Sequence, residues 1–168
     1  MKYTKEQLKT INSLRKVDDH IYTLHYQNDY GRDEIINGNA KGLISVYRNI
    51  QKYFKSTQPL INPIRPNGGC VGITANNKNN EMLFARNFDY KETNCLITWI
   101  DNKKGYKSLC MVDFTFLGYG IKHFKIENSN KARLLAAPFV CMDGMNEKGL
   151  TTSKIKFVCV TPGTILIS

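Results

Sequence analysis

One cysteine in this chain, Cys70, lies in a sequence context that suits a nucleophile. It follows Gly68 and Gly69 and begins an apolar run. A thiol attacks an amide well only when a base removes its proton. If the Gly69–Cys70 bond is cut, Cys70 gains a free α-amino group, whose pKa of about 8 in model compounds makes it such a base. The two glycines permit the strained backbone in which the thiol reaches the preceding carbonyl.

The other candidate bases and ligands have no motif around them. The histidines and the remaining cysteines are His20, His25, His123, Cys95, Cys110, Cys141 and Cys159. These cysteines include no CxxC pair and have no histidine nearby, so we expect no metal site. Most of them lie in apolar runs, which favours burial in a core. By itself, however, Gly-Gly-Cys is also typical of an ordinary loop before a strand.

The stretch GCVGITANNKNNEMLFARNFDY, which begins at Gly69, is more specific. It resembles the linear amide C–N hydrolases, the family that includes choloylglycine (bile salt) hydrolase, penicillin V acylase and N-acylethanolamine acid amidase. Those cysteine N-terminal-nucleophile (Ntn) hydrolases begin their mature chain with Cys, pass through a β-hairpin and reach an Arg-Asn-x-Asp sequence. Arg86, Asn87 and Asp89 have the matching spacing from Cys70. A second block, MDGMNEKGL, resembles a later element of the same family.

The resemblance implies a catalytic role for three residues. Cys70 would be the nucleophile, and Asp89 would hold its new α-amino group. Arg86 would lie beside the thiol, where a cation favours the thiolate, and would help to position the substrate. The alternative for Arg86 and Asp89 is an ordinary surface ion pair on a hairpin. No metal and no cofactor is implied.

Two further positions are candidate contacts for the oxyanion or the substrate. Asn87 belongs to the first motif. Relatives take an oxyanion donor from the residue before the aromatic in the strand after DGMNEKGL, where it is typically Asn or Tyr. Here Lys156 precedes Phe157, which is a departure. Lysine can still serve if the donor is the backbone N–H, but a side chain that matters for substrate choice would differ from that of the relatives. Asn146 and Glu147 are expected to be structural turn residues before that strand.

The segment before Cys70 is expected to be helical over residues 1–58. Thr4 and Gln7 predict a capping box, and apolar residues at helical spacing predict a stronger helix over about 40–55. Three prolines between residues 59 and 69 then favour an extended, exposed connector.

After Cys70 the pattern changes to short apolar runs that are typical of strands. Residues 70–75 and 82–87 flank the polar turn NNKNNE, which predicts a hairpin. Further strands are expected at residues 96–100 and 108–116 and within 149–160.

We therefore expect an α+β fold with two segments. Residues 1–69 would be a helical, propeptide-like leader with a proline-rich connector, and residues 70–168 the N-terminal half of an Ntn-hydrolase domain. The resemblance implies an αββα sandwich, which needs a longer chain after Cys70 to supply a second oxyanion donor and a further Arg. A truncated chain is therefore expected, and an inactive remnant is the alternative to an enzyme.

Composition bears on the remaining function classes. Hydrophobic residues make up 42% and charged residues 23%, as in ordinary globular proteins. Because there is neither an apolar run of membrane-spanning length nor a signal-peptide centre, we expect a cytoplasmic location. The net charge of +10 raises a basic nucleic-acid-binding module as an alternative, but the lysines are scattered.

The expected function is hydrolysis of a linear, non-peptide amide C–N bond after self-cleavage between Gly69 and Cys70. The expected partner is a small acyl–amine conjugate, with no nucleic acid and no membrane span. A full-length form could be a homo-oligomer.

Overall fold

The computed structural model describes residues 3–27, 29–38, 41–56, 58–62, 69–90, 93–101, 104–120 and 122–153. The helices are α1 (Lys5–Asn12), α2 (Arg32–Ile36) and α3 (Leu43–Tyr53), with 3-10 helices η1 (Phe114–Leu117) and η2 (Lys131–Phe139). The strands are β1 (Arg15–Asp18), β2 (Ile21–Tyr26), β3 (Gly69–Asn76), β4 (Met82–Asp89), β5 (Cys95–Ile100), β6 (Ser108–Asp113), β7 (Asp143–Asn146) and β8 (Thr151–Ser153). The chain is a mixed α+β protein with a mostly sheet-based core.

Six strands form one sheet in the order β1-β2-β5-β6-β7-β8. The β2 and β5 strands are parallel and pair over their whole length, whereas the other neighbours are antiparallel. The expectation that residues 1–58 are helical is therefore wrong for residues 15–26. The β2 sequence IYTLHY is rich in aromatic and β-branched residues, which favour a half-buried strand, and Leu24 and Tyr26 are buried.

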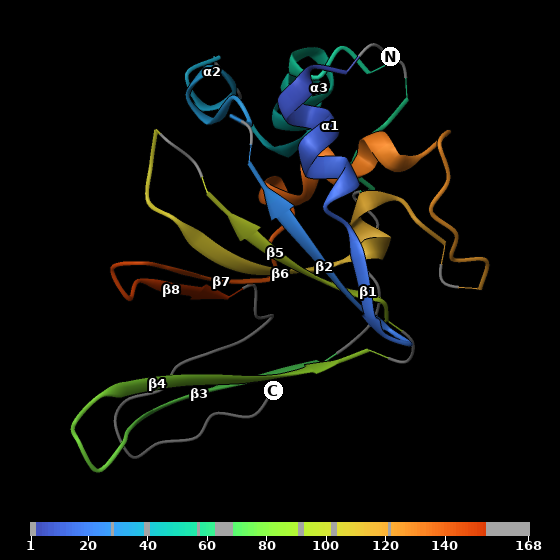
Figure 1. Ribbon diagram of the computed structural model, residues 1–168. Helices are drawn as coiled ribbons and strands as arrows, with labels where there is room; N and C mark the ends of the chain where they lie inside the picture. The colour runs from blue at the N-terminus through green and yellow to red at the C-terminus, as the bar shows by residue number, and fades with distance from the viewer. Residues whose placement is uncertain are drawn as a thin grey trace.

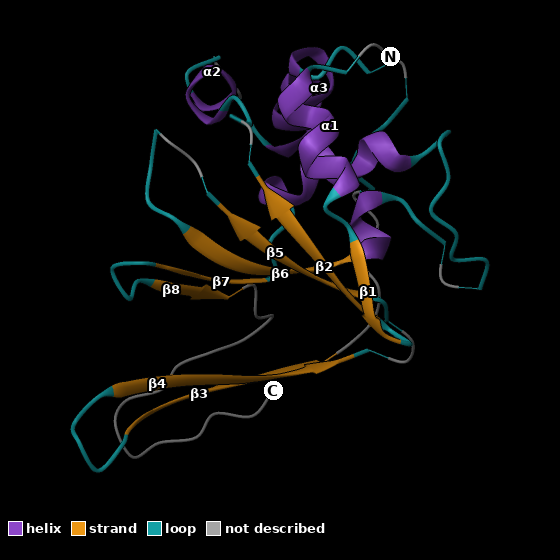
Figure 2. Cartoon of the chain, viewed as in Figure 1, coloured by secondary structure: helices purple, strands orange, loops and turns teal. Residues whose placement is uncertain are grey.

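Helices cover one face of this sheet (Figures 1 and 2). The α1 helix begins with the capping box predicted at Thr4 and Gln7, and α3 lies within the range predicted for the second helix. Tyr26 reaches from β2 to η2, where its hydroxyl donates a hydrogen bond of 2.8 Å to the Leu135 carbonyl. The main core therefore forms between the sheet and its helical layer.

The β3 and β4 strands form a separate two-stranded sheet on the other side of the six-stranded sheet (Figure 1). Their antiparallel register confirms the hairpin predicted around the NNKNNE turn. In that turn the Asn77 side-chain oxygen accepts hydrogen bonds from the backbone N–H groups of Asn79 and Glu81, each at 2.9 Å. Such local bonds are why asparagine favours turns.

The connector before the hairpin differs from the expectation in its described part. Leu60 and Ile61 are buried, at 3% and 7% exposure, and the Asn62 N–H donates to the Phe116 carbonyl at 2.7 Å. The expectation of an exposed connector is wrong here, because these two apolar side chains join the core. The α3 helix ends at Tyr53, before the first of the three prolines, and residues 63–68 lie outside the described residues.

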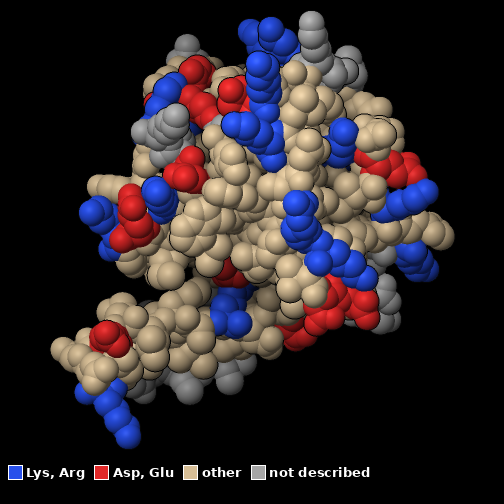
Figure 3. All heavy atoms as spheres, in the orientation of Figure 1, with Lys and Arg blue, Asp and Glu red and all other residues tan. Residues whose placement is uncertain are grey.

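Charged side chains of both signs are interspersed on the face shown in Figure 3. Ion pairs at the surface of the molecule include Lys104 with Asp29 at 2.7 Å and Lys125 with Glu127 at 2.6 Å. In the described part of the chain, no helix has both the length and the apolar character needed to cross a membrane.

The position of β2 in the sheet generates a stability prediction. Leu24→Ala should lower the free energy of unfolding by about 2–4 kcal/mol, because it leaves a cavity beside β5. Val17→Ala, on β1 with 64% exposure, is the control and should change it by less than about 0.5 kcal/mol. Urea unfolding measures both. A small effect of Leu24→Ala would mean that the first strands are not part of the cooperative core.

Candidate functional site

Cys70 is the second residue of β3 and lies opposite Phe88 on β4. The next pair of residues on the same face of the hairpin is Gly72 opposite Arg86. Directly opposite residues point to the same face of a hairpin, so Cys70 and Arg86 share one face. The Cys70 side chain is buried, at 8% exposure.

Arg86 donates a hydrogen bond directly to the Cys70 thiol. Its Nη2 donates to Cys70 Sγ at 2.9 Å. Its Nη1 lies 2.6 Å from Asp143 Oδ2 and 3.2 Å from the Met142 carbonyl oxygen. The Arg86 side chain is only 3% exposed, so the alternative of an ordinary surface ion pair is wrong for it. The structure places Arg86 beside the thiol, where the resemblance puts it.

The charge on Arg86 is maintained inside the protein by its partners. Burial disfavours the charged guanidinium, but hydrogen bonds to Asp143 and Cys70 outweigh burial and raise the pKa of Arg86 above its ordinary value. The guanidinium carbon also lies 5.0 Å from the centre of the Phe88 ring, within the range of a cation–π contact. A fixed positive charge therefore faces Cys70 Sγ.

Asp143 is the residue of this cluster that the sequence analysis missed. It is the first residue of β7 and opens the DGMNEKGL block. Its Oδ1 accepts a hydrogen bond from the Ser153 hydroxyl, and its carbonyl accepts one from the Cys141 thiol at 2.8 Å. The only sequence signal was an acidic residue at the start of the second motif, and nothing in the sequence connected it with Arg86.

The other candidate residues lie apart from the thiol. Asp89 and Asn87 are exposed and lie on the opposite face of β4 from Arg86. Within the described residues, neither forms a hydrogen bond or ion pair with Cys70. Asp89 does lie opposite Gly69 in the ladder, beside the peptide bond expected to be cut. Lys156 lies outside the described residues.

Asn146 and Glu147 are turn residues, as predicted. Asn146 Oδ1 accepts hydrogen bonds from the backbone N–H groups of Lys148 at 2.9 Å and Leu150 at 3.1 Å. The Glu147 N–H donates to the Lys107 carbonyl at 2.9 Å. These bonds form the tight connection between β7 and β8, and so place Asp143 and Ser153 side by side.

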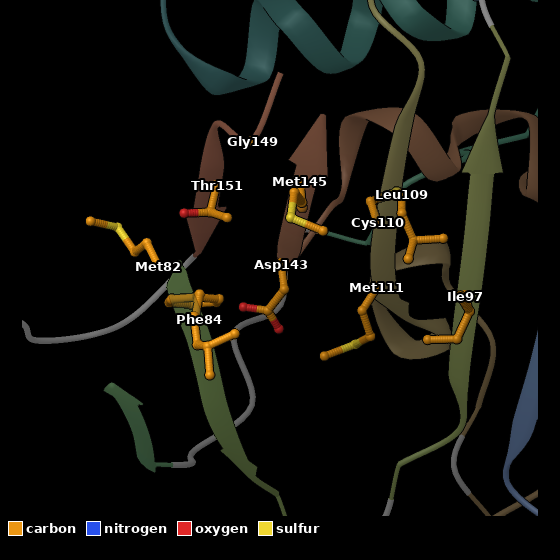
Figure 4. Close-up of a pocket in the computed structure, with 12 residues that line it drawn as sticks. Met82, Phe84, Ile97, Leu109, Cys110, Met111, Asp143, Met145, Gly149 and Thr151 are labelled. Atoms are coloured by element: carbon orange, nitrogen blue, oxygen red, sulfur yellow. The ribbon is translucent and has the colours of Figure 1, made fainter. Parts of the chain in front are cut away.

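An apolar cavity of about 460 Å³ opens between the hairpin and the six-stranded sheet. Met82 and Phe84 line it from the hairpin, and Met111, Asp143 and Met145 line it from the six-stranded sheet (Figure 4). Phe84 is two residues from Arg86 on the same face of β4. The cavity therefore begins next to Arg86, the residue that contacts the Cys70 thiol. The arrangement can bind an apolar group near Cys70.

Two titratable groups, the half-buried Cys95 and the buried Asp113, lie near the other end of the hairpin, where Phe88 faces β5 and β6. Burial raises the pKa of Cys95 to about 11, which makes it a neutral thiol at physiological pH. Burial also raises the pKa of Asp113, although hydrogen bonds from the Thr115 N–H and hydroxyl lower it in part. Neither group has a cationic partner within the described residues.

No group of His, Cys, Asp and Glu side chains among the described residues could hold a metal ion. The cluster instead combines a thiol, a buried cation and a carboxylate, which is suited to nucleophilic attack. Comparison of the chain with protein-family models, curated proteins and solved structures found no match in any of the three.

Breaking the Arg86–Asp143 pair should destabilise the fold. Arg86→Gln is expected to lower the free energy of unfolding by about 2–4 kcal/mol, because it leaves a largely buried carboxylate without its cation. Lys104→Gln, which removes an exposed ion pair with Asp29, is the control and should have little effect. Equal effects of the two substitutions in urea unfolding would contradict the buried geometry.

Asp113 generates a prediction about pH. Its folded-state pKa is raised, so this carboxyl reduces stability above that pKa, and the penalty disappears as the pH falls below its unfolded-state value. Asp113→Asn, whose amide oxygen can still accept from Thr115, should therefore stabilise the protein more at pH 8 than at pH 3. Urea unfolding at both values tests this, with exposed Asp33→Asn as the control. A pH-independent difference would contradict it.

Proposed function

We propose that this chain belongs to the linear amide C–N hydrolases and uses Cys70 as an N-terminal nucleophile. The observation that carries the proposal is the 2.9 Å contact between Arg86 Nη2 and Cys70 Sγ. Two residues 16 positions apart meet in the way that the resemblance requires, in a buried place where a donor to sulfur stabilises a thiolate.

The reaction would begin with a cut between Gly69 and Cys70. The thiol attacks the Gly69 carbonyl, the bond to the Cys70 nitrogen breaks, and water hydrolyses the resulting thioester. The freed α-amine can then take the thiol proton. Asp89, which lies opposite Gly69 in the ladder, would orient this amine once the chain is cut.

Turnover would follow the same chemistry on a bound substrate. The Cys70 thiolate attacks the substrate carbonyl, and the leaving amine receives the proton from the α-ammonium group. Water then attacks the thioester, releasing the carboxylic acid and restoring the thiol. Arg86 donates to the sulfur throughout, which favours its charged form. The proposed substrate is an acyl–amine conjugate.

The layers of the molecule and its cavity support this proposal. Helices, a six-stranded sheet and the β3–β4 sheet follow one another in space (Figure 2), an order that agrees with the first three layers of an αββα sandwich. The apolar cavity bounded by Phe84 and Asp143 lies beside Arg86 and suits the acyl part of a substrate.

The segment before the cut would remain bound. The β2 strand pairs with β5 over six residue pairs, and Leu60 and Ile61 are buried in the core. Removing this segment would take away α1, α2 and α3 and expose the edge of β5 and much of the sheet face that these helices cover. The processed protein would therefore be a complex of two chains rather than a free mature domain.

Processing at Gly69–Cys70 is the first prediction of the proposed function. The chain should yield two fragments, the second beginning with Cys70, whereas Cys70→Ala should stay full length because it lacks the attacking thiol. Intact mass and N-terminal sequencing measure the site, and Cys95→Ala is the control that should still be cut. If the second fragment began at another residue, Cys70 would not have the free α-amino group that is the proposed base, and the mechanism would be contradicted.

Asp89 provides a second prediction. Asp89→Asn should lower turnover on the order of tenfold or more by disturbing the orientation of the α-amine, with an unchanged thermal midpoint because the side chain is exposed. The assay uses a phenoxyacyl penam, a bile-salt conjugate and a fatty acyl amide. Glu81→Gln, an exposed acid on the same hairpin, is the control. Turnover equal to that of the unsubstituted chain would contradict this role and show that Asp89 is an ordinary surface carboxylate.

A further inference from the structure

The two terminal nitrogens of Arg86 have different partners. Nη2 faces Cys70 Sγ, and Nη1 binds Asp143 Oδ2 at 2.6 Å. A guanidinium is planar and rigid, so fixing one nitrogen on a carboxylate restricts the direction of the other. The direction in which Nη2 donates to the thiol therefore depends on Asp143.

Asp143 itself is held on both sides. It pairs with Met111 on β6 and with Ser153 on β8. One carboxylate oxygen binds Arg86, and the other accepts from the Ser153 hydroxyl. A carboxylate with partners on both oxygens has little freedom to rotate, and Figure 4 shows it pointing from β7 toward the hairpin.

The pair also joins two separate sheets. Arg86 belongs to the hairpin, whereas Asp143 belongs to the six-stranded sheet. Their side chains are 3% and 19% exposed, so water and salt screen the attraction less than they screen the exposed ion pairs. The sheet thereby fixes the position of a side chain that acts on the hairpin.

We propose that Asp143 is a positioning residue, fixed by Ser153, that holds Arg86 so that Nη2 faces Cys70 Sγ. The inference rests on the proposed role of Cys70 as the nucleophile. It assigns to the DGMNEKGL block a part in activating the thiol, in addition to its structural turn. Without the carboxylate, Nη1 loses its charged partner, and Nη2 loses the constraint that this contact places on its direction.

The test is the rate at which iodoacetamide alkylates Cys70 in the full chain between pH 5 and 10, followed by peptide mass mapping. Asp143→Asn keeps the shape and one acceptor oxygen but loses the charge. It should slow alkylation at pH 7 about tenfold. Asp101→Asn, which removes an exposed pair with Lys107 at 3.5 Å, should not change the rate. An unchanged or faster rate in Asp143→Asn would overturn the proposal.

A double-mutant cycle separates positioning from a merely structural effect. If Asp143 acts through Arg86, Asp143→Asn should change the rate by less than about twofold in an Arg86→Gln background. A tenfold effect that persists there would overturn the proposal. Ser153→Ala keeps the ion pair but frees Oδ1. It should give an intermediate decrease, and it serves as the decisive variant if Asp143→Asn does not fold.

This readout is independent of the hydrolase proposal, because alkylation requires neither cleavage nor turnover. If the chain is never cut, but Asp143→Asn slows alkylation of Cys70 only when Arg86 is present, the result supports the positioning role and contradicts the hydrolase. A chain that is cut and active without this coupling supports the hydrolase and overturns the positioning role.

Discussion

A buried cation between two sheets is the interaction on which the site depends. Arg86 lies on the hairpin, and its nitrogens bind Cys70 on the neighbouring strand and Asp143 on the six-stranded sheet. A buried charge is costly unless all its partners are in place. The packing of the hairpin on the six-stranded sheet and the geometry around the thiol therefore depend on each other, because both rely on the contacts of Arg86.

The same constraint explains why the first part of the chain matters to the site. The sheet that carries Asp143 also contains β1 and β2, and the core beneath it includes side chains from before the hairpin, such as Leu24 and Ile61. If the chain is cut at Gly69 as proposed, Cys70 would thus remain on a scaffold built partly by the segment before the cut. Stability of that scaffold and reactivity of Cys70 are physically connected.

The sequence was sufficient where structure is decided locally. The hairpin around the NNKNNE turn follows from alternation and asparagine turn chemistry, and its register puts Arg86 and Cys70 on one face. It was not sufficient for β2, because a parallel partner such as β5 is far along the chain and pairing depends on tertiary context. Asp143 was missed for the same reason, since its contact with Arg86 exists only after the hairpin packs on the sheet.

The central claim is that Cys70, freed by cleavage, forms an acyl thioester. The most direct measurement is to mix the processed protein with a fatty acyl p-nitrophenyl ester, quench in acid and locate the acyl group by mass spectrometry. We predict one acyl group on Cys70 and released nitrophenol in at least equal amount. Acylation at another residue, or none in the processed protein, would contradict the account.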